Sequence, residues 1–163
     1  PTTNVYMEED SFCEMEMVQL RGVTSTVRDT NAELAAGAKL VLIEKLLTHD
    51  KQEATSNMKV ELKGEDSTVQ VISRSVAQDD SVQIFNPLVI GEAKCHGHVQ
   101  CDAIIMGNAK VKAIPGIEAA SEDAMLVHEA AIGKIAGDQI VKLMTLGLTE
   151  EEAEAEILDD FLS

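Results

Sequence analysis

The sequence predicts a mainly β chain that ends in two short helices. Between about residues 5 and 128, apolar and polar residues mostly alternate, which is the pattern of half-buried strands. Clusters of turn-forming residues separate these runs. A short phrase also recurs, as GAK at 37–39, GEAK at 91–94 and GNAK at 107–110. Such recurrence is typical of stacked coils, although a sandwich of two sheets produces a similar alternation.

The clearest strand is MKVELKG at 58–64, where Met58, Val60 and Leu62 would share one face. The same alternation predicts further strands at 68–76, 82–85, 88–90, 99–106 and 111–114. Turn-forming residues predict breaks between them at 64–66, 79–80, 86–87, 91, 107–108 and 115–116.

The last part of the chain changes to a helical period. GDQIVKLMTLG at 137–147 carries apolar residues at helical spacing. In TEEEAEAEILDDFL at 149–162, Thr149 and Glu152 form a capping box, and acidic residues crowd the first turn, where the helix dipole favours them.

The change of period divides the chain into a strand region at 1–128 and a helical segment at 129–163. Two short helices cannot bury all of their apolar surface alone. We therefore expect them to dock on the strands or on a partner.

Composition excludes some classes of partner. The 163 residues include 29 acidic and 13 basic ones, so the formal net charge is -16, which disfavours nucleic acid and anionic membranes. Aromatic residues make up 2%, so the stacking platforms of single-strand binders are missing. The chain has no apolar run of about 18 residues and only three cysteines. This small, odd number is no disulfide framework, and we expect a reducing, cytoplasmic location.

The stretch KCHGHVQC raises the question of a metal site, because Cys95, His96, His98 and Cys101 are all zinc ligands by type. In an extended strand the two cysteines would face one way and the two histidines the other. They could enclose one ion only if Gly97 broke the strand. The alternative for Cys101 is a buried, inert thiol.

Residues 70–162 resemble the C-terminal region of the SufB/SufD family, the scaffold proteins of the SUF iron–sulfur cluster assembly machinery. The motifs that carry the resemblance are ISRS (72–75), GHVQCD (97–102), IPGIEA (114–119), HEAAIGKI (128–135) and GLTEEEA (147–153). Residues 1–69 fit the family only loosely and look shortened.

The resemblance implies a right-handed parallel β-helix followed by a helical segment. It also implies pairing through the β-helices, as a homodimer or a SufB–SufD-type heterodimer. The helices, at about 138–162, would dock a SufC-type ABC ATPase. ATP hydrolysis would belong to that partner, so the chain would be a scaffold and not an enzyme. A separate sulfur donor protein would supply the sulfur.

The resemblance also implies a site for a transiently assembled iron–sulfur cluster. Cys101 matches the cysteine of GHVQCD, which is characteristic of SufB-like members. Glu129 matches a carboxylate implicated in cluster formation, and His128 lies beside it. Val127 stands where some members carry an acid, and Cys95 is a possible further thiolate. Since one cysteine cannot close a four-thiolate site, other ligands would come from a second subunit or a thiol supplied in trans.

Two alternatives stay open. The first is a SufD-like structural subunit that holds no cluster. The second is a small mononuclear metal-binding β-protein that uses Cys95, His96, His98 and Cys101.

Overall fold

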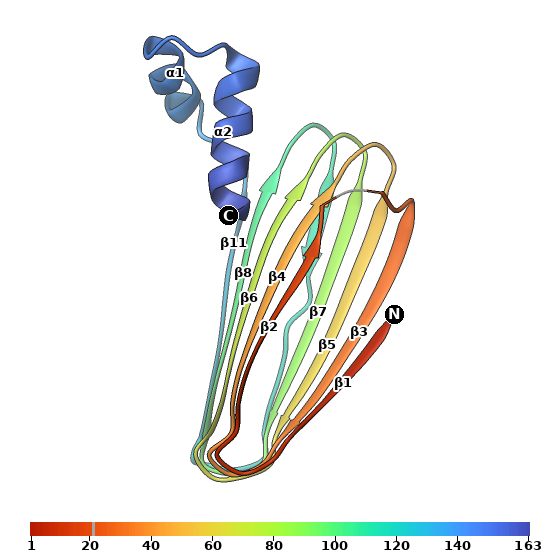
Figure 1. Ribbon diagram of the computed structural model, residues 1–163, viewed down its shortest axis with the longest axis vertical. Coiled ribbons are helices and arrows are strands. Elements are labelled where there is room, and N and C mark those ends of the chain that lie inside the picture. Colours follow the sequence, from red (N-terminus) through yellow and green to blue (C-terminus); the bar gives the residue numbers. More distant parts are fainter. Residues whose placement is uncertain (21) are drawn as a thin grey trace.

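The computed structural model describes residues 1–20 and 22–163, which form a parallel β-solenoid followed by two helices (Figure 1). Each coil contributes strands to two facing sheets. Sheet A has the order β1-β3-β5-β7-β10, with β9 also paired to β7, and sheet B has the order β2-β4-β6-β8-β11. All of these pairings are parallel. The predicted stacked coils are confirmed, and the sandwich alternative is wrong.

The strands of sheet A are β1 (Thr2–Met7), β3 (Ser25–Leu34), β5 (Glu53–Leu62), β7 (Val82–Gly91), β9 (Lys110–Ala113) and β10 (Gly116–Ala119). The strands of sheet B are β2 (Phe12–Gln19), β4 (Lys39–Thr48), β6 (Ser67–Ala77), β8 (Cys95–Ile105) and β11 (Ala124–Gly133). The helices are α1 (Gly137–Thr145) and α2 (Glu150–Leu162). We call the end with the A-to-B turns the lower end and the end near the helices the upper end, as they lie in Figure 1.

The lower turns stack directly on one another. The backbone N–H of Gly37 donates to the Glu65 carbonyl oxygen at 2.9 Å, and that of Asp66 donates to the Lys94 carbonyl oxygen at 2.7 Å. Gly37 and Asp66 both have positive φ angles, of 69° and 59°, which glycine and aspartate tolerate better than most residues. A Cβ at Gly64 would collide with the backbone of the neighbouring coil at Ala36. This close approach explains the glycine there.

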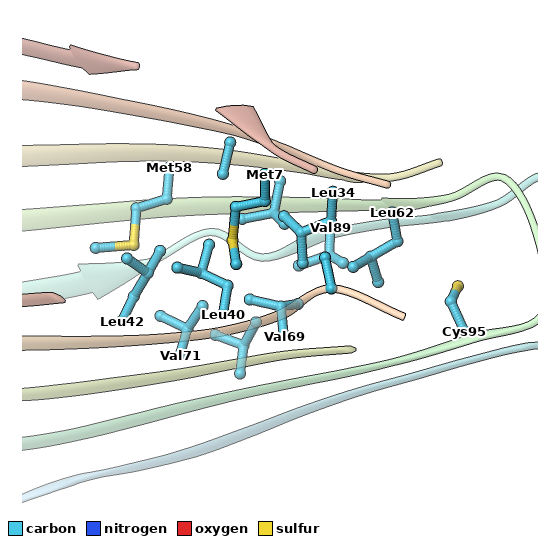
Figure 2. Close-up of a cluster of buried hydrophobic side chains, with 14 of the residues drawn as sticks. Met7, Leu34, Leu40, Leu42, Met58, Leu62, Val69, Val71, Val89 and Cys95 are labelled. Carbon is cyan, nitrogen blue, oxygen red and sulfur yellow. The ribbon is translucent and has the colours of Figure 1, made fainter. Parts of the chain in front are cut away.

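The core lies between the two sheets in the lower half of the solenoid (Figure 2). The predicted inward set of β5, Met58, Val60 and Leu62, is buried to 3% exposure or less, and Leu34 and Leu42 are fully buried beside it. Aliphatic side chains fill this narrow space without aromatic rings, apart from Phe85 in the upper half. Parallel strands stacked this closely favour such small side chains.

The turn predicted at 86–87 is wrong, because β7 runs without interruption through both residues. Asn86 continues an outer amide ladder: its Nδ2 donates to Asn57 Oδ1 at 2.8 Å, and Asn57 Nδ2 donates to Asp29 Oδ1 at 2.9 Å. Pro87 has no N–H, and the next strand is broken beside it, between Ala113 and Gly116. Asn86 and Pro87 therefore do not interrupt β7, and the break lies in the neighbouring strand, between β9 and β10.

The change from strand to helix comes later than the predicted boundary at 128, since β11 continues to Gly133. The predicted capping box of α2 is confirmed: Glu152 N–H donates to Thr149 Oγ1 at 3.2 Å, and Thr149 N–H donates to Glu152 Oε2 at 2.8 Å. Helix α1 has no buried residue, and α2 has only Ala153. Among the described residues, no helix is long and apolar enough to cross a membrane.

Candidate functional site

Strand β8 sorts its side chains onto two faces, as an extended strand must. Cys95, Val99 and Cys101 point into the solenoid and are buried, whereas His96 and His98 point outward from sheet B. Because Gly97 continues the strand, the four zinc-type ligands do not converge. The geometry therefore does not support the mononuclear metal-binding alternative.

Cys101 is an interior residue in the upper half of the solenoid, with 1% of its surface exposed. The register of sheet B places it in one ladder with Ser73 on β6 and Glu44 on β4. On its other side the ladder continues to Ala130 on β11, the last strand of the sheet. Cys101 thus lies one coil from the C-terminal end of the solenoid, inside a row of polar side chains.

A small cavity of about 10 Å³ lies against this ladder, with room for about one water molecule. Its polar lining consists of Cys101, Glu44, Gln83 and the hydroxyls of Ser56, Ser73 and Ser75. Burial, together with the smaller effects of the nearby Asp102 and Glu44 carboxylates, raises the pKa of the Cys101 thiol to about 11. In the isolated chain at neutral pH, Cys101 is therefore a protonated thiol.

Glu44 is the charged member of the ladder and is only 2% exposed. Its carboxylate accepts a hydrogen bond of 2.7 Å from Ser56 Oγ and pairs with Arg28 Nη1 at 3.3 Å. Burial nevertheless raises its pKa, against the opposing effects of Ser56 and Arg28. Burying a carboxylate inside the solenoid with so few partners costs folding free energy. The upper interior therefore keeps a polar group at a cost in stability.

His128 faces the same interior as Cys101. It lies opposite Val99 in the β11–β8 register, next to the Ala130–Cys101 pair. Its Nε2 is buried and, within the part of the chain that the structure describes, has no hydrogen-bond partner. Burial lowers the pKa of the imidazole, and the neighbouring His98 lowers it further. A neutral imidazole with a free nitrogen is available as a ligand.

Glu129 faces outward, away from Cys101, because it is the next residue after His128 on a strand that does not end until Gly133. Its Oε2 lies 3.2 Å from Nε2 of His98 on the outer face of sheet B. The expectation that Cys101 and Glu129 share one site therefore does not match this arrangement. The structure brings Cys101 and His128 to one face, and Glu129 and His98 to the other.

Cys95 lies in the apolar half of the interior and is fully buried (Figure 2). It is six positions from Cys101 along an extended strand, or about 20 Å. The two thiols cannot bind one ion. Cys95 is part of the core cluster, and burial raises its pKa as well.

A second group of ligand-type side chains lies at the upper turns, where His49, Asp50 and Asp79 approach one another. The Asp79 carboxylate accepts a hydrogen bond of 2.8 Å from the Asp50 backbone N–H. His49 Nδ1 lies 2.8 Å from the Asp50 carboxylate. These contacts join successive turns and account for the group without an ion.

Sequence reasoning missed Glu44, and it missed the contact between His98 and Glu129. The signal for Glu44 was present, because in the run LVLIEKLL it shares the phase of Leu42 and Leu46, which both face inward. A charged residue in an inward phase indicates a polar interior. The prediction that His98 faces away from the cysteines is confirmed, but its partner on β11 depends on the strand register.

The fold is a parallel β-solenoid with a buried cysteine one coil from its C-terminal end. The chain belongs to the family described as "SUF system FeS cluster assembly, SufBD core domain", whose model matches residues 1–161. The match includes residues 1–69, which form the same solenoid. The resemblance seen in the sequence is confirmed.

Archaeal proteins are among the similar relatives, and they are named as iron–sulfur cluster assembly SufBD family proteins. One from Methanothermobacter thermautotrophicus (strain Delta H) is 37% identical over 64% of this chain and 26% of its own length. The protein MJ0034 from Methanocaldococcus jannaschii is 31% identical over 94% of this chain and 49% of its own length. The chain thus spans between about a quarter and about half of these relatives.

Proposed function

We propose that this chain is a SufB-like scaffold subunit, on which iron and sulfide are assembled into a cluster that is then passed on. Cys101 supplies the thiolate sulfur, or its thiolate attacks the outer sulfur of a persulfide on the donor protein, so that the sulfur is transferred and the donor cysteine leaves as a thiolate. The observation that carries the proposal is the interior ladder that holds Cys101 one coil from the end of the solenoid, on the face that also carries His128.

The ligand types suit a cluster that must be released. A site built from one thiolate and one imidazole holds iron less tightly than a four-thiolate site. Within the described residues, His128 offers an Nε2 without a hydrogen-bond partner, on the same face as Cys101 and one register pair away from it. Such a mixed and incomplete set favours transfer of the cluster over permanent storage.

A second subunit would complete the site. Strand β11 is the end of sheet B, so the backbone groups along its free edge have no strand partner among the residues that the structure describes. Its exposed apolar residues Met125 and Val127 lie on the outer face of sheet B beside that edge. We propose pairing there with a second copy or with a SufD-type partner, which would bring further ligands to the end of the solenoid that carries Cys101.

The helices would bind the SufC-type ATPase. Val141, Met144 and Leu146 are 60%, 44% and 74% exposed, so the helical segment presents apolar surface that its own solenoid does not cover. ATP hydrolysis would take place in that partner, and the chain would act as a scaffold and not as an enzyme. We further propose a cytoplasmic location and a separate protein that donates sulfur.

A SufD-like structural role is the second candidate, and one observation favours it. Cys101 is only 1% exposed and its pKa is raised to about 11, which are the properties of an inert core thiol. On this alternative the chain would support assembly of the complex without holding a cluster.

Anaerobic reconstitution with ferrous iron and sulfide tests the proposal, with Cys101→Ser and Cys95→Ser as a matched pair. Both cysteines lie on the inner face of the same strand and both are buried, so the pair differs mainly in position along the strand. We expect the wild type and Cys95→Ser to take up labile iron and sulfide and to transfer them to an apo-ferredoxin. We expect Cys101→Ser to take up little.

Equal loading and transfer by Cys101→Ser would remove the scaffold role of this thiol. A wild type that loads no iron, alone or with its ATPase and partner subunit present, would instead support the structural role. Far-UV circular dichroism of the two variants checks that both retain the solenoid.

A further inference from the structure

The outer faces of the two sheets differ in how their side chains are satisfied. On sheet A, an amide ladder and a lysine–glutamate pair join outward polar side chains of neighbouring coils. On sheet B, the lower part of the outer face carries apolar side chains at both edges. Phe12 on β2 is 66% exposed, and Met125 and Val127 on β11 are 61% and 49% exposed. Parallel sheets are usually covered on both faces, so this part of sheet B is a candidate contact surface.

A hollow of about 430 Å³ lies on this face and takes in residues from all five strands of sheet B. One row of register partners lines it from edge to edge: Phe12, Lys39, Thr68, His96 and Met125. Since neighbouring strands lie about 4.8 Å apart, the row is about 19 Å long. An α-helix of about 13 residues has the same length. The hollow therefore matches one short helix laid across the strands.

The hollow is free of carboxylates. Among the described residues no acidic one lines it, although the chain has 29 acidic residues. Glu14, in the next row, stands at the β2 edge outside the lining. Lys39 lines the hollow, and within the described part of the chain it pairs with no carboxylate, whereas the lysines at 45, 59, 63 and 94 each do. The imidazole of His96 adds a hydrogen-bond donor.

An acidic amphipathic helix fits these features. Its apolar side would cover Phe12 and Met125, and a carboxylate beside that side would pair with Lys39. A chain with a formal net charge of -16 repels an acidic segment over most of its surface. The absence of carboxylates from the hollow therefore makes it selective for such a segment, since like charges disfavour the other places.

A second copy of this chain fits the face less well. Ile43 and Ile72 extend its apolar part by one row, so it spans about 20 Å along the strands and about 19 Å across them. Face-to-face packing of two copies would bury about 800 Å² in total, below the roughly 1,200 Å² of a stable interface. The area suits one helix and not a second solenoid.

We propose that this hollow docks an acidic amphipathic helix of a partner protein, laid across the five strands of sheet B. Phe12 and Met125 are the apolar contacts at its two ends, and Lys39 is its charge contact. Pairing of a second subunit along the edge of β11 would extend sheet B in its own plane and leave this face open. The docking site does not depend on the scaffold role of Cys101, which faces the interior.

Fluorescence anisotropy with a labelled synthetic peptide tests the site on the full chain. The probe is a helix-stapled peptide of about 14 residues, with leucine and glutamate at helical spacing. The wild type should bind it saturably. Lys39→Glu and Phe12→Ser should each weaken binding by about tenfold, because the first places like charges together and the second removes an apolar contact.

Each variant has a matched control on sheet A. Lys110→Glu makes the same change of charge as Lys39→Glu, and both lysines are the exposed first residue of a strand. Tyr6→Ser matches Phe12→Ser, because Tyr6 is an exposed aromatic residue of the same first coil, at 73% exposure. Both controls should bind the peptide as the wild type does.

Three results would overturn the docking site. The first is a wild type that shows no saturable binding of the peptide. The second is binding by Lys39→Glu and Phe12→Ser that equals the binding by Lys110→Glu and Tyr6→Ser. The third comes from sedimentation velocity: self-association of the wild type that Phe12→Ser abolishes and Tyr6→Ser retains would assign the face to a second copy.

Discussion

The lower and upper halves of the solenoid interior are built from the same strands but differ in chemistry. In the lower half, residues such as Leu34, Leu62 and Val89 make a closed aliphatic core. In the upper half the same strands turn Glu44 and Gln83 inward, with serines between them, and both are at most 3% exposed. The lower half therefore holds the coils together, while the upper half keeps polar groups inside at a cost in stability.

The two cysteines of β8 show what the difference means for reactivity. Cys95 and Cys101 face the same interior from the same strand and both belong to the hydrophobic cluster, but Cys101 also lies in a ladder with Glu44 and Ser73. Residue type and orientation are equal, so the two thiols differ in their polar neighbours. The half of the interior in which a cysteine lies therefore describes its surroundings better than the number of cysteines does.

The largest expected effect is the loss of a core side chain in the lower half. Leu62→Ala should lower the free energy of unfolding by about 3 kcal/mol, because Leu62 is fully buried and the close coils cannot collapse onto the cavity. Ser75→Ala in the upper half is the control and should cost about 1 kcal/mol or less. Urea unfolding followed by circular dichroism measures both. Equal losses would mean that the two halves contribute alike to stability.

Much of the fold could be predicted from local pattern. Alternation in MKVELKG identified the inward set of β5, and the capping box of α2 was read directly from Thr149 and Glu152. The turn at 86–87 was wrong, because Asn86 and Pro87 have their roles through neighbouring coils. The local sequence does not show which residues contact one another between neighbouring coils.

The site was harder to predict for the same reason. Alternation along β8 was sufficient to show that Cys95 and Cys101 face away from His96 and His98. Which residues lie across from them depends on the register between strands, and the register sets Glu44 in the ladder of Cys101 and Glu129 beside His98. Family resemblance supplied Glu129 as a candidate but not the face on which it lies.

The three cysteines should differ in their rate of alkylation in the folded chain. At pH 8 Cys13, which is only partly buried, should react first with iodoacetamide. The thiolate fraction of Cys101 should be about a hundredfold lower than that of an ordinary cysteine, since its pKa is raised from 9.0 to about 11. Its reaction should accelerate only as the pH rises toward that value. Peptide mass spectrometry measures each site, and unfolding in urea should make the three rates similar.

Cys95 is the reference for Cys101 in this experiment, because burial raises the pKa of Cys95 as well. Both interior thiols should stay protected at pH 8, and opening of the last coil should release Cys101 before Cys95. Modification of Cys101 as fast as that of Cys13 in the folded chain at pH 8 would mean that the upper interior is open to solvent and that the two halves do not differ in access.

The smallest effect should come from Glu44→Gln, and its sign depends on pH. Burial raises the pKa of Glu44 in the folded chain above its ordinary value, so the folded state binds the proton more tightly than the unfolded state does. The contribution of this group to stability is therefore fully present below about pH 4.5 and is lost as the pH rises through the raised value. Glutamine resembles the protonated acid in shape and does not ionise. The variant should match the wild type in acid and exceed it at pH 7, by on the order of 1 kcal/mol.

Urea unfolding of Glu44→Gln and of the wild type at a series of pH values from 4 to 8 measures this growing difference in stability. Glu61→Gln is the control. Glu61 is a carboxylate on the outer surface of β5, and its pKa is lowered by the hydrogen bond from Lys59, so its removal should cost stability at neutral pH and not add to it. A wild type that stays more stable than Glu44→Gln at pH 7 would mean that the pair with Arg28 outweighs the burial of the carboxylate. The polar half would then be a source of stability, as the aliphatic half is.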